Sequence, residues 1–237
     1  MGCYKHYSFD LWLTLIKSNT LFKKTRSRIF HEQYNFHSRS LEEVEHIFRS
    51  VDVMANTINE RTGLNMDAYE MYLMVISLMN DHKVNLHDID IEALYSEMDN
   101  LLFEFLPQLY STDTIPVLAE IKEHDNTVNI LSNTGFIKGC TLRKVLQELK
   151  MDVYFDFQLY SDEAGFSKPN RQFFDLMIAG ACKLQPLELQ QILHIGDNIK
   201  ADIAGAAGAG ICSLQINSND VSIKQLTNHV PSRLLTT

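Results

Sequence analysis

The sequence lacks a long run of basic residues, and its overall charge is acidic. Acidic residues outnumber basic ones 30 to 21, which gives a formal net charge of −9 at pH 7. Proteins that bind nucleic acids gather Lys and Arg on one face or in one segment, and this chain shows no such cluster. We therefore expect no nucleic-acid partner.

Cysteine is scarce, and its spacing excludes the common cysteine-based sites. The sequence has no Cys-x-x-Cys pair and no grouping of cysteine with histidine that would indicate zinc. Its four cysteines are Cys3, Cys140, Cys182 and Cys212. We predict free thiols in a reducing compartment and hence a cytoplasmic location.

Long apolar segments are also missing. The longest apolar run, residues 71–79, is interrupted by Tyr72 and Ser77 and is much shorter than the ~20 residues that span a bilayer. The residues before Asp10 include no apolar stretch of signal-peptide length. The glycine-rich segment 205–210 lacks the Gly-Lys-Ser/Thr sequence of a phosphate-binding loop. We expect a soluble protein with no membrane partner.

The sequence does contain alternating strand-like and helix-like segments. At 237 residues, with 45% apolar residues, one core domain with an insertion is the natural expectation. Short strands are predicted at about residues 4–9, 127–131, 155–160, 191–195 and 211–216. Helices are predicted at about residues 116–124, 139–150, 171–182 and 199–207. Strands separated by helices predict an α/β fold with a mostly parallel sheet covered on both faces.

Between residues 20 and 107 the apolar spacing is helical throughout. Apolar residues recur at intervals of three and four from Leu41 to Ile58. Ser40 and Glu43 form a capping-box pair before this stripe, and Gly63 is a plausible helix stop after it. Similar stripes occupy residues 69–79 and 94–105. Three or four helices can bury these stripes in one another, which predicts an inserted helical unit.

Polar residues follow the predicted strands of the α/β part. Asp10 follows the first strand, Ser132 and Asn133 follow the second, Lys168 lies in the loop after the third, and Asp197 follows the fourth. Each residue alone is explained as a helix cap, a turn residue or a solvated loop residue. The carboxyl ends of parallel strands share one edge of a sheet, so we predict that these side chains converge there.

These motifs, in this order, resemble those of the haloacid dehalogenase superfamily. The first corresponds to Phe9–Leu15, the second to Leu131–Asn133, the third to Lys168–Pro169, and the fourth to Gly196–Asp197 with Asp202. The resemblance covers nearly the whole chain. It implies a Rossmann-like parallel-sheet core formed by residues 1–16 and 108–237, with residues 17–107 as an all-helical cap domain inserted between the first two motifs.

The resemblance also implies a role for each motif residue. Asp10 would attack phosphorus or a halogen-bearing carbon and form a covalent intermediate that water cleaves. Ser132, Asn133 and Lys168 would bind the transferring group, and Lys168 would offset its charge. Mg²⁺ would be held by Asp10, the backbone carbonyl of Trp12, and Asp197. The supporting residues would be Thr14, Asn198 and Asp202, with Asp202 orienting Lys168 or a metal-bound water.

Trp12 departs from the family's phosphatase pattern, in which a second Asp at this position serves as acid and base. Indole has no titratable proton near neutral pH. General acid and base catalysis is worth ~100- to 10,000-fold, so turnover should be reduced unless another group substitutes. His31, His37 and His46 of the cap are candidates for that substitution. An aromatic residue here is also what the dehalogenases show, because a halide leaving group needs no proton.

Three functions therefore remain open. A Mg²⁺-dependent phosphohydrolase acting on a small phosphate monoester is favoured, because Gly196–Asp197 resembles the metal-binding motif of the phosphatases. A 2-haloacid dehalogenase would need no metal, and would use a cap arginine for the halide, for which Arg39 is a loose positional candidate. A catalytically degenerate member would bind a phosphorylated ligand or a protein.

The cap should set substrate choice, because it must close over the site to exclude water. Four aromatic residues in its first part could line the inner face of the cap, but stripes at helical spacing usually form the core. These residues are Phe22, Phe30, Tyr34 and Phe36. We predict that they form the core of the cap. Substrate identity and oligomeric state are not predicted.

Overall fold

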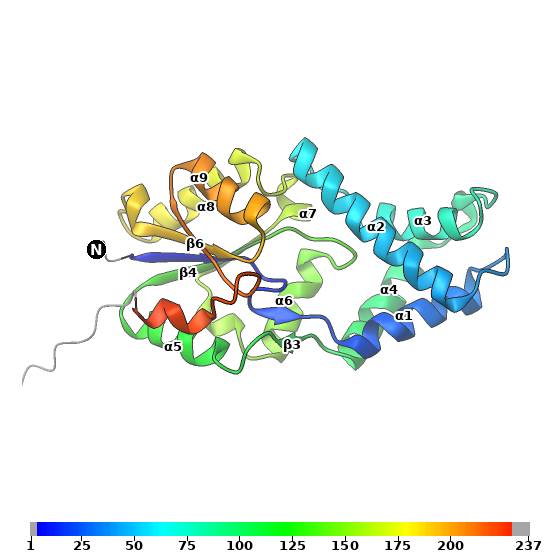
Figure 1. Ribbon diagram of the computed structural model, residues 1–237, viewed down its shortest axis with the longest axis horizontal. Helices are drawn as coiled ribbons and strands as arrows, with labels where there is room; N and C mark the ends of the chain where they lie inside the picture. Colours follow the sequence, from blue (N-terminus) through cyan, green and yellow to red (C-terminus); the bar gives the residue numbers. More distant parts are fainter. Residues whose placement is uncertain (1–3, 229–237) are drawn as a thin grey trace, which may run out of the picture.

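The computed structural model describes residues 4–228. A five-stranded parallel sheet lies at the centre of one part of it, and a group of helices lies to one side of that part (Figure 1). The strand order is β5-β4-β1-β6-β7, and every neighbouring pair is parallel. The strands are β1 (His6–Phe9), β4 (Thr127–Ser132), β5 (Phe157–Tyr160), β6 (Ile192–Gly196) and β7 (Cys212–Gln215). The predicted α/β fold with a parallel sheet is confirmed.

Helices cover both faces of this sheet (Figure 1). One face carries α5 (Thr114–Glu123), α6 (Gly139–Glu148) and the 3₁₀ helix η5 (Ile223–Asn228), which bury apolar side chains with β1 and β4. The other face carries α8 (Arg171–Leu184) and α9 (Gly205–Ala209). Shorter turns are η2 (Asp152–Tyr154), α7 (Ser161–Ala164) and η3 (Leu189–Gln191). Burial of the strands on both sides explains their nearly continuous apolar sequence.

Two predicted elements differ from the observed ones. β5 begins at Phe157, and not at Phe155, because residues 152–154 form a 3₁₀ turn that the amide of Phe155 closes on Asp152. The predicted helix at 199–207 is a π-helical turn, η4 (Ile199–Ala204), followed by α9. Ile203 N donates to the carbonyl of Asn198, five residues earlier, which is the wider π spacing.

Four α-helices between the short strands β2 (Ile16–Lys17) and β3 (Gln108–Leu109) form what we call the helical module. They are α1 (Thr20–Gln33), α2 (Leu41–Thr62), α3 (Ala68–Met79) and α4 (Ile91–Glu104), with a short 3₁₀ turn, η1 (Leu86–Asp88). The predicted capping box of Ser40 and Glu43 and the stop at Gly63 (φ 70°) are confirmed. The two-residue strands β2 and β3 are antiparallel and lie at the base of the module.

Most of the apolar side chains of the helical module form one cluster, which Phe136 and Val145 of the α/β part join. Phe22 and Phe30 are buried in it, and Tyr34 packs against it, as predicted for a cap core. The prediction is wrong for Phe36, which is 61% exposed. Phe36 lies in the turn after α1, beyond the last turn of the helical stripe.

Within residues 4–228, none of the helices combines the length and apolarity needed to cross a membrane. Cys140, Cys182 and Cys212 are free thiols, as predicted. Cys3 lies outside the described residues.

A buried histidine in β1 predicts how the stability of the core depends on pH. His6 Nε2 donates to the side-chain oxygen of Asn129 (2.8 Å), and Nδ1 accepts from Thr127 (2.7 Å). Burial lowers the pKa of His6 to about 4. Unfolded His6 binds a proton near pH 6.5 while folded His6 stays neutral, so its contribution to stability is complete above pH 6.5 and is lost towards pH 4.

We therefore expect the free energy of unfolding to fall by about 3 kcal/mol, from this group alone, as the pH drops from 6.5 to 4. Urea unfolding of wild type and His6→Gln across this range measures the effect. The slope should flatten in His6→Gln and persist in His46→Gln, whose histidine is exposed. Equal slopes in the wild type and His6→Gln would contradict the assignment.

Candidate active site

Asp10 directly follows β1, at the carboxyl edge of the sheet. Its amide donates to Ile195 O on β6 (2.8 Å), and Thr14 Oγ1 donates to its Oδ2 atom (3.0 Å). The loop between them turns tightly, because the amides of Leu15 and Ile16 both donate to the carbonyl of Leu11. This turn brings Thr14 back onto the Asp10 carboxylate and fixes its orientation.

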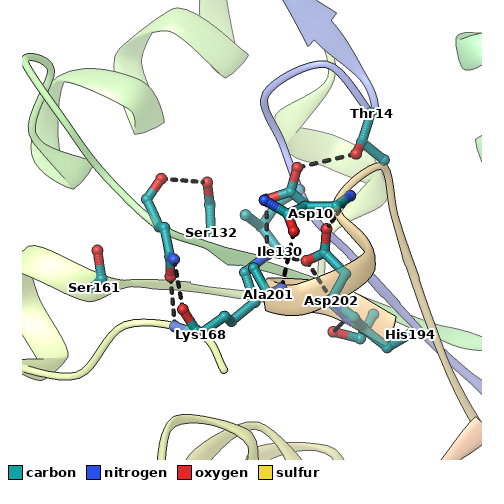
Figure 2. Close-up of polar contacts among 12 residues, drawn as sticks. Asp10, Thr14, Ile130, Ser132, Ser161, Lys168, His194, Ala201 and Asp202 are labelled. Carbon is teal, nitrogen blue, oxygen red and sulfur yellow. Dashed lines mark hydrogen bonds and ion pairs between the residues drawn. The ribbon is translucent and has the colours of Figure 1, made fainter. Parts of the chain in front are cut away.

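Lys168 lies between two carboxylates in the centre of the site (Figure 2). Its Nζ atom is 2.8 Å from Asp10 Oδ1 and 2.7 Å from Asp202 Oδ1, and only 1% of its side chain is exposed. The Asn133 side chain holds the backbone of Lys168 in place. It accepts from Lys168 N (2.7 Å) and donates to Lys168 O (3.0 Å). The second and third motifs are thus joined through these two residues.

Asp202 is held from several sides. Its Oδ1 atom also contacts His194 Nε2 (3.1 Å), and its Oδ2 atom accepts from Asn198 N (3.0 Å). A side chain at Gly196 would bring its Cβ to 2.2 Å from Asp202 Cγ, so only glycine leaves room for this carboxylate. The glycine of the fourth motif therefore has a packing function at the site.

Three carboxylates gather around this single lysine. Oxygen atoms of Asp10, Asp197 and Asp202 lie within 4.8 Å of one another. With all three ionised, Lys168 leaves the cluster two negative charges in excess. Burial raises the pKa of Asp10 to about 7 and that of Asp197 to about 6, while Lys168 opposes both shifts. Burial acts against Asp202 too, but Lys168 and His194 hold its pKa well below the usual range.

The excess charge and the donor types define what the cluster can bind. All three side chains offer oxygen atoms, which hard divalent cations such as Mg²⁺ prefer. A divalent cation would offset the two surplus negative charges and favour the ionised form of Asp10. The donor set of this structure therefore fits Mg²⁺.

The side chains of Ser132 and Asn198 form their hydrogen bonds with groups other than the Asp10 carboxylate. Ser132 ends β4 and is fully buried, and its hydroxyl donates to the carbonyl of Asn133 (3.1 Å). The Asn198 side chain caps η4 by accepting from the amides of Lys200 and Ala201, and its Nδ2 atom is 3.3 Å from Glu60 of the helical module. Neither side chain forms a hydrogen bond with Asp10 in this conformation.

A cavity of about 780 Å³ joins this cluster to the helical module. Asp10, Lys168 and Asp197 line it from the sheet side, and α1 and α2 line it from the module side. Trp12 lines the cavity and also packs against the apolar core of the sheet, so it belongs both to the site and to the core. The cavity places Trp12 next to Asp10 and exposes both to the same bound molecule.

The cap residues that the sequence suggested for this site lie elsewhere. None of His31, His37 and His46 lines the cavity. Arg39 also lies outside it and pairs with Glu43 (3.2 Å) and with Asp81. Sequence alone did not show which side of α1 and α2 faces the sheet, nor where the loop with His37 and Arg39 lies.

The structure adds residues that sequence reasoning missed. On the module side the cavity is lined by Arg26 of α1 and by the carboxylates Glu45, Asp52 and Glu60 of α2. Arg26 had a detectable signal, since it occupies the apolar stripe between Phe22 and Phe30 at helical spacing. His194 had none, because it lies inside an otherwise ordinary strand.

Removing the central cation should strongly destabilise the protein. Lys168→Met leaves Asp10 and Asp202 buried without their shared partner, and breaking a buried ion pair in this way costs about 3–5 kcal/mol. Urea unfolding of the metal-free protein at pH 8 measures this loss. The loss should shrink at pH 5, where protonation neutralises Asp10.

The control for this experiment is Lys200→Met, which breaks an exposed pair with Glu60 (2.8 Å). Exposed pairs contribute about 0–1 kcal/mol, so this variant should remain near the wild type. Equal losses in the two variants would contradict a central electrostatic role for Lys168.

Comparisons with known proteins show relatives in sequence and in fold. The glyceraldehyde 3-phosphate phosphatase of Methanothermobacter thermautotrophicus is 26% identical over 108 residues, 45% of this chain and 44% of that protein. The HAD-hydrolase YfnB from Bacillus subtilis, whose crystal structure is bound to magnesium, superposes with a TM-score of 0.73 at 17% identity, covering 96% of this chain and 98% of YfnB.

A 2-haloacid dehalogenase from Pseudomonas syringae shares the fold with a TM-score of 0.63 at 16% identity, covering 95% of this chain and 97% of that one. The fold is thus common to phosphatases and dehalogenases. The family model for haloacid dehalogenase-like hydrolases matches residues 7–216, from the first strand of the sheet to the end of the last one. With this match over most of its length, the chain belongs to the haloacid dehalogenase-like hydrolases.

Proposed function

We propose that this protein is a Mg²⁺-dependent phosphohydrolase that cleaves a small phosphate monoester through an aspartyl-phosphate on Asp10. The observation that carries the proposal is the cluster of Asp10, Asp197 and Asp202 around Lys168, with its two surplus negative charges. A dehalogenase has no use for such a cation-binding set. A phosphatase needs it, because an anionic nucleophile must approach an anionic phosphate.

In this proposal the Asp10 carboxylate attacks phosphorus, and the bond from phosphorus to the ester oxygen breaks as the acyl phosphate forms. The ester oxygen leaves as the alcohol by taking a proton from water, since Trp12 supplies none. Thr14 and Lys168 hold the carboxylate in line. Lys168 offsets negative charge on the transferring group, and Asp202 positions Lys168. Water then attacks the phosphoryl group, which releases inorganic phosphate and regenerates Asp10.

The residues proposed to hold Mg²⁺ are Asp10, the backbone carbonyl of Trp12, and Asp197. When bound, the ion would offset charge on the carboxylates and on the phosphoryl oxygens. Ser132 is proposed to bind the transferring group, which requires its hydroxyl to turn away from the carbonyl of Asn133 that it contacts here. The amide of Asn133 would assist, since the Asn133 side chain is already committed to Lys168.

We also propose that residues 17–107 act as a cap domain over a core formed by residues 1–16 and 108–237. The apolar cluster, most of whose residues come from the helical module, supports this division. The cavity supports it as well, since both parts contribute to its walls. A cap that closes this cavity would exclude water from the acyl phosphate until hydrolysis.

One observation favours a second candidate, a 2-haloacid dehalogenase. Trp12 supplies no proton to a leaving alkoxide, and a halide leaving group needs none. The position of Arg39 outside the cavity removes the arginine suggested for halide binding.

The test is a panel of phosphate monoesters and 2-haloacids, with and without Mg²⁺, in which phosphate and halide release are both followed. Phosphate release that needs Mg²⁺ is the expected result. Halide release without metal would establish the dehalogenase. Measurable Mg²⁺ binding with neither product would identify a binding protein in place of an enzyme.

A further inference from the structure

Arg26 of α1 is a buried cation whose charge is not balanced by the protein. Only 7% of the residue is exposed, and its Nε atom has no hydrogen-bond partner. None of the ion pairs among residues 4–228 includes it. Burial lowers the pKa of Arg26, and the neighbouring groups that oppose this shift are the Tyr72 hydroxyl and the Asp52 carboxylate.

Aromatic rings form most of the surroundings of this guanidinium. Its Cζ atom lies 4.1 Å from the ring centroid of Phe48, 4.7 Å from that of Phe136 and 5.4 Å from that of Phe22. Such contacts offset only part of the cost of removing a cation from water. The three rings therefore surround the guanidinium without supplying an anion to balance its charge.

The position of Arg26 connects this unbalanced charge to the active site. Arg26 lines the same cavity as Asp10 and Lys168, from the opposite wall. A molecule long enough to cross this cavity from Asp10 reaches Arg26. Guanidinium groups bind carboxylate and phosphate through two parallel hydrogen bonds, so an anionic group is the natural partner for this residue.

The other charged residues of the cavity wall do not change this conclusion. Lys23, Lys24, Glu45 and Arg49 are exposed, so water already solvates their charges. Glu60 is paired with Lys200 (2.8 Å). Asp52 is the carboxylate whose charge acts on the pKa of Arg26. It lies beyond ion-pair distance from Arg26 and is exposed to the cavity. Asp52 therefore reduces the attraction for an anion without replacing it.

We propose that Arg26 binds a second anionic group of the substrate, a carboxylate or a further phosphate, at the end of the molecule remote from Asp10. This inference rests on the proposed function. It limits the substrates of the enzyme to small phosphate monoesters that carry a second anionic group at some distance from the phosphate. Arg26 would be a specificity residue, which recognises the substrate but takes no part in breaking bonds.

Binding can be tested without turnover by titration calorimetry in an Asp10→Asn background with Mg²⁺. The probes are ω-carboxyalkyl phosphates of increasing chain length, each compared with the alkyl phosphate of the same length. At the best-fitting length the carboxylate should tighten binding about tenfold or more, as a charge-assisted bidentate contact does. Arg26→Met should abolish this preference, while Arg28→Met, on an exposed residue of the same helix, should retain it.

Two variants separate recognition from a structural role. Arg26→Met should have a Tm equal to or above that of the wild type, because it removes an unbalanced buried charge. Asp52→Asn should tighten binding of the carboxylate probes, because it removes the opposing negative charge. A large loss of Tm in Arg26→Met, with no change in probe preference in Asp52→Asn, would overturn the proposal.

A second titration is independent of phosphatase chemistry. Linear dicarboxylates and sodium bromide are added separately to the wild type and to Arg26→Met. Saturable dicarboxylate binding that Arg26→Met abolishes supports the inference even if no phosphate monoester is hydrolysed. Binding of bromide alone, or of neither probe, would overturn it, whichever reaction the enzyme catalyses.

Discussion

Asp10→Asn should lower kcat for phosphate monoesters by about 10⁴-fold or more, which is the scale on which loss of a covalent nucleophile acts. The amide has nearly the shape of the carboxylate, so Thr14 and the surrounding loop can keep their positions. An amide cannot form the acyl phosphate, however, and the only step that breaks the ester bond is lost. Phosphate release by wild type and variant, both with saturating Mg²⁺, measures the effect.

The control for this prediction is Asp113→Asn. The Asp113 carboxylate does not line the cavity, and it pairs with Lys224 (3.2 Å). It should turn over at the wild-type rate. Asp10→Ala guards against slow conversion of Asn back to Asp. If a folded Asp10→Ala variant kept a rate within tenfold of wild type, Asp10 would not be the nucleophile.

Trp12→Asp should raise kcat for phosphate monoesters by about 10²- to 10⁴-fold, the range that a positioned general acid and base supplies. Trp12 lines the cavity beside Asp10, so an Asp at this position faces the same bound molecule. Its carboxyl group would protonate the leaving oxygen and then activate the water that cleaves the acyl phosphate. The rate is measured with an alkyl ester, whose leaving group needs the proton most.

Trp12→Phe is the matched control, because it shortens the side chain without adding a titratable group. It should leave the rate near that of the wild type. The expected gain should also be smaller for aryl phosphates, whose leaving groups are better. An unchanged or lower rate in a folded Trp12→Asp variant would show that proton transfer does not limit turnover. Asp52→Asn would then test whether this cavity carboxylate already serves as the acid.

The sheet and the gathering of its polar residues were accessible from sequence, since both depend on local patterns. Strand-length apolar segments alternating with helices allow few arrangements other than a parallel sheet. Asp10 and Asp197 then have to meet at one edge, because each follows a strand directly. The packing of Asp202 against Gly196 became visible only in the structure, where a Cβ atom at position 196 would lie 2.2 Å from Asp202 Cγ.

The placement of the module residues could not be predicted in the same way. A helical stripe shows which residues of α1 are buried but not against which partner, and the sequence does not show where the loop with Arg39 lies. The structure distinguishes the two arginines, because Arg39 pairs with Asp81 at the module surface, whereas Arg26 contacts the rings of Phe48 and Phe136. The commitment of Asn133 to Lys168 was hidden for a related reason, since it joins loops 35 residues apart.

The measurement that tests the central claim most directly is the mass of the peptide containing Asp10 after rapid acid quench of a single turnover. With a phosphate monoester and Mg²⁺, the peptide should gain a phosphoryl group that hydroxylamine removes, and the gain should be absent without metal. With a 2-haloacid, its mass should not change. A carboxyalkyl ester on Asp10, or no covalent adduct although phosphate is released, would contradict the account.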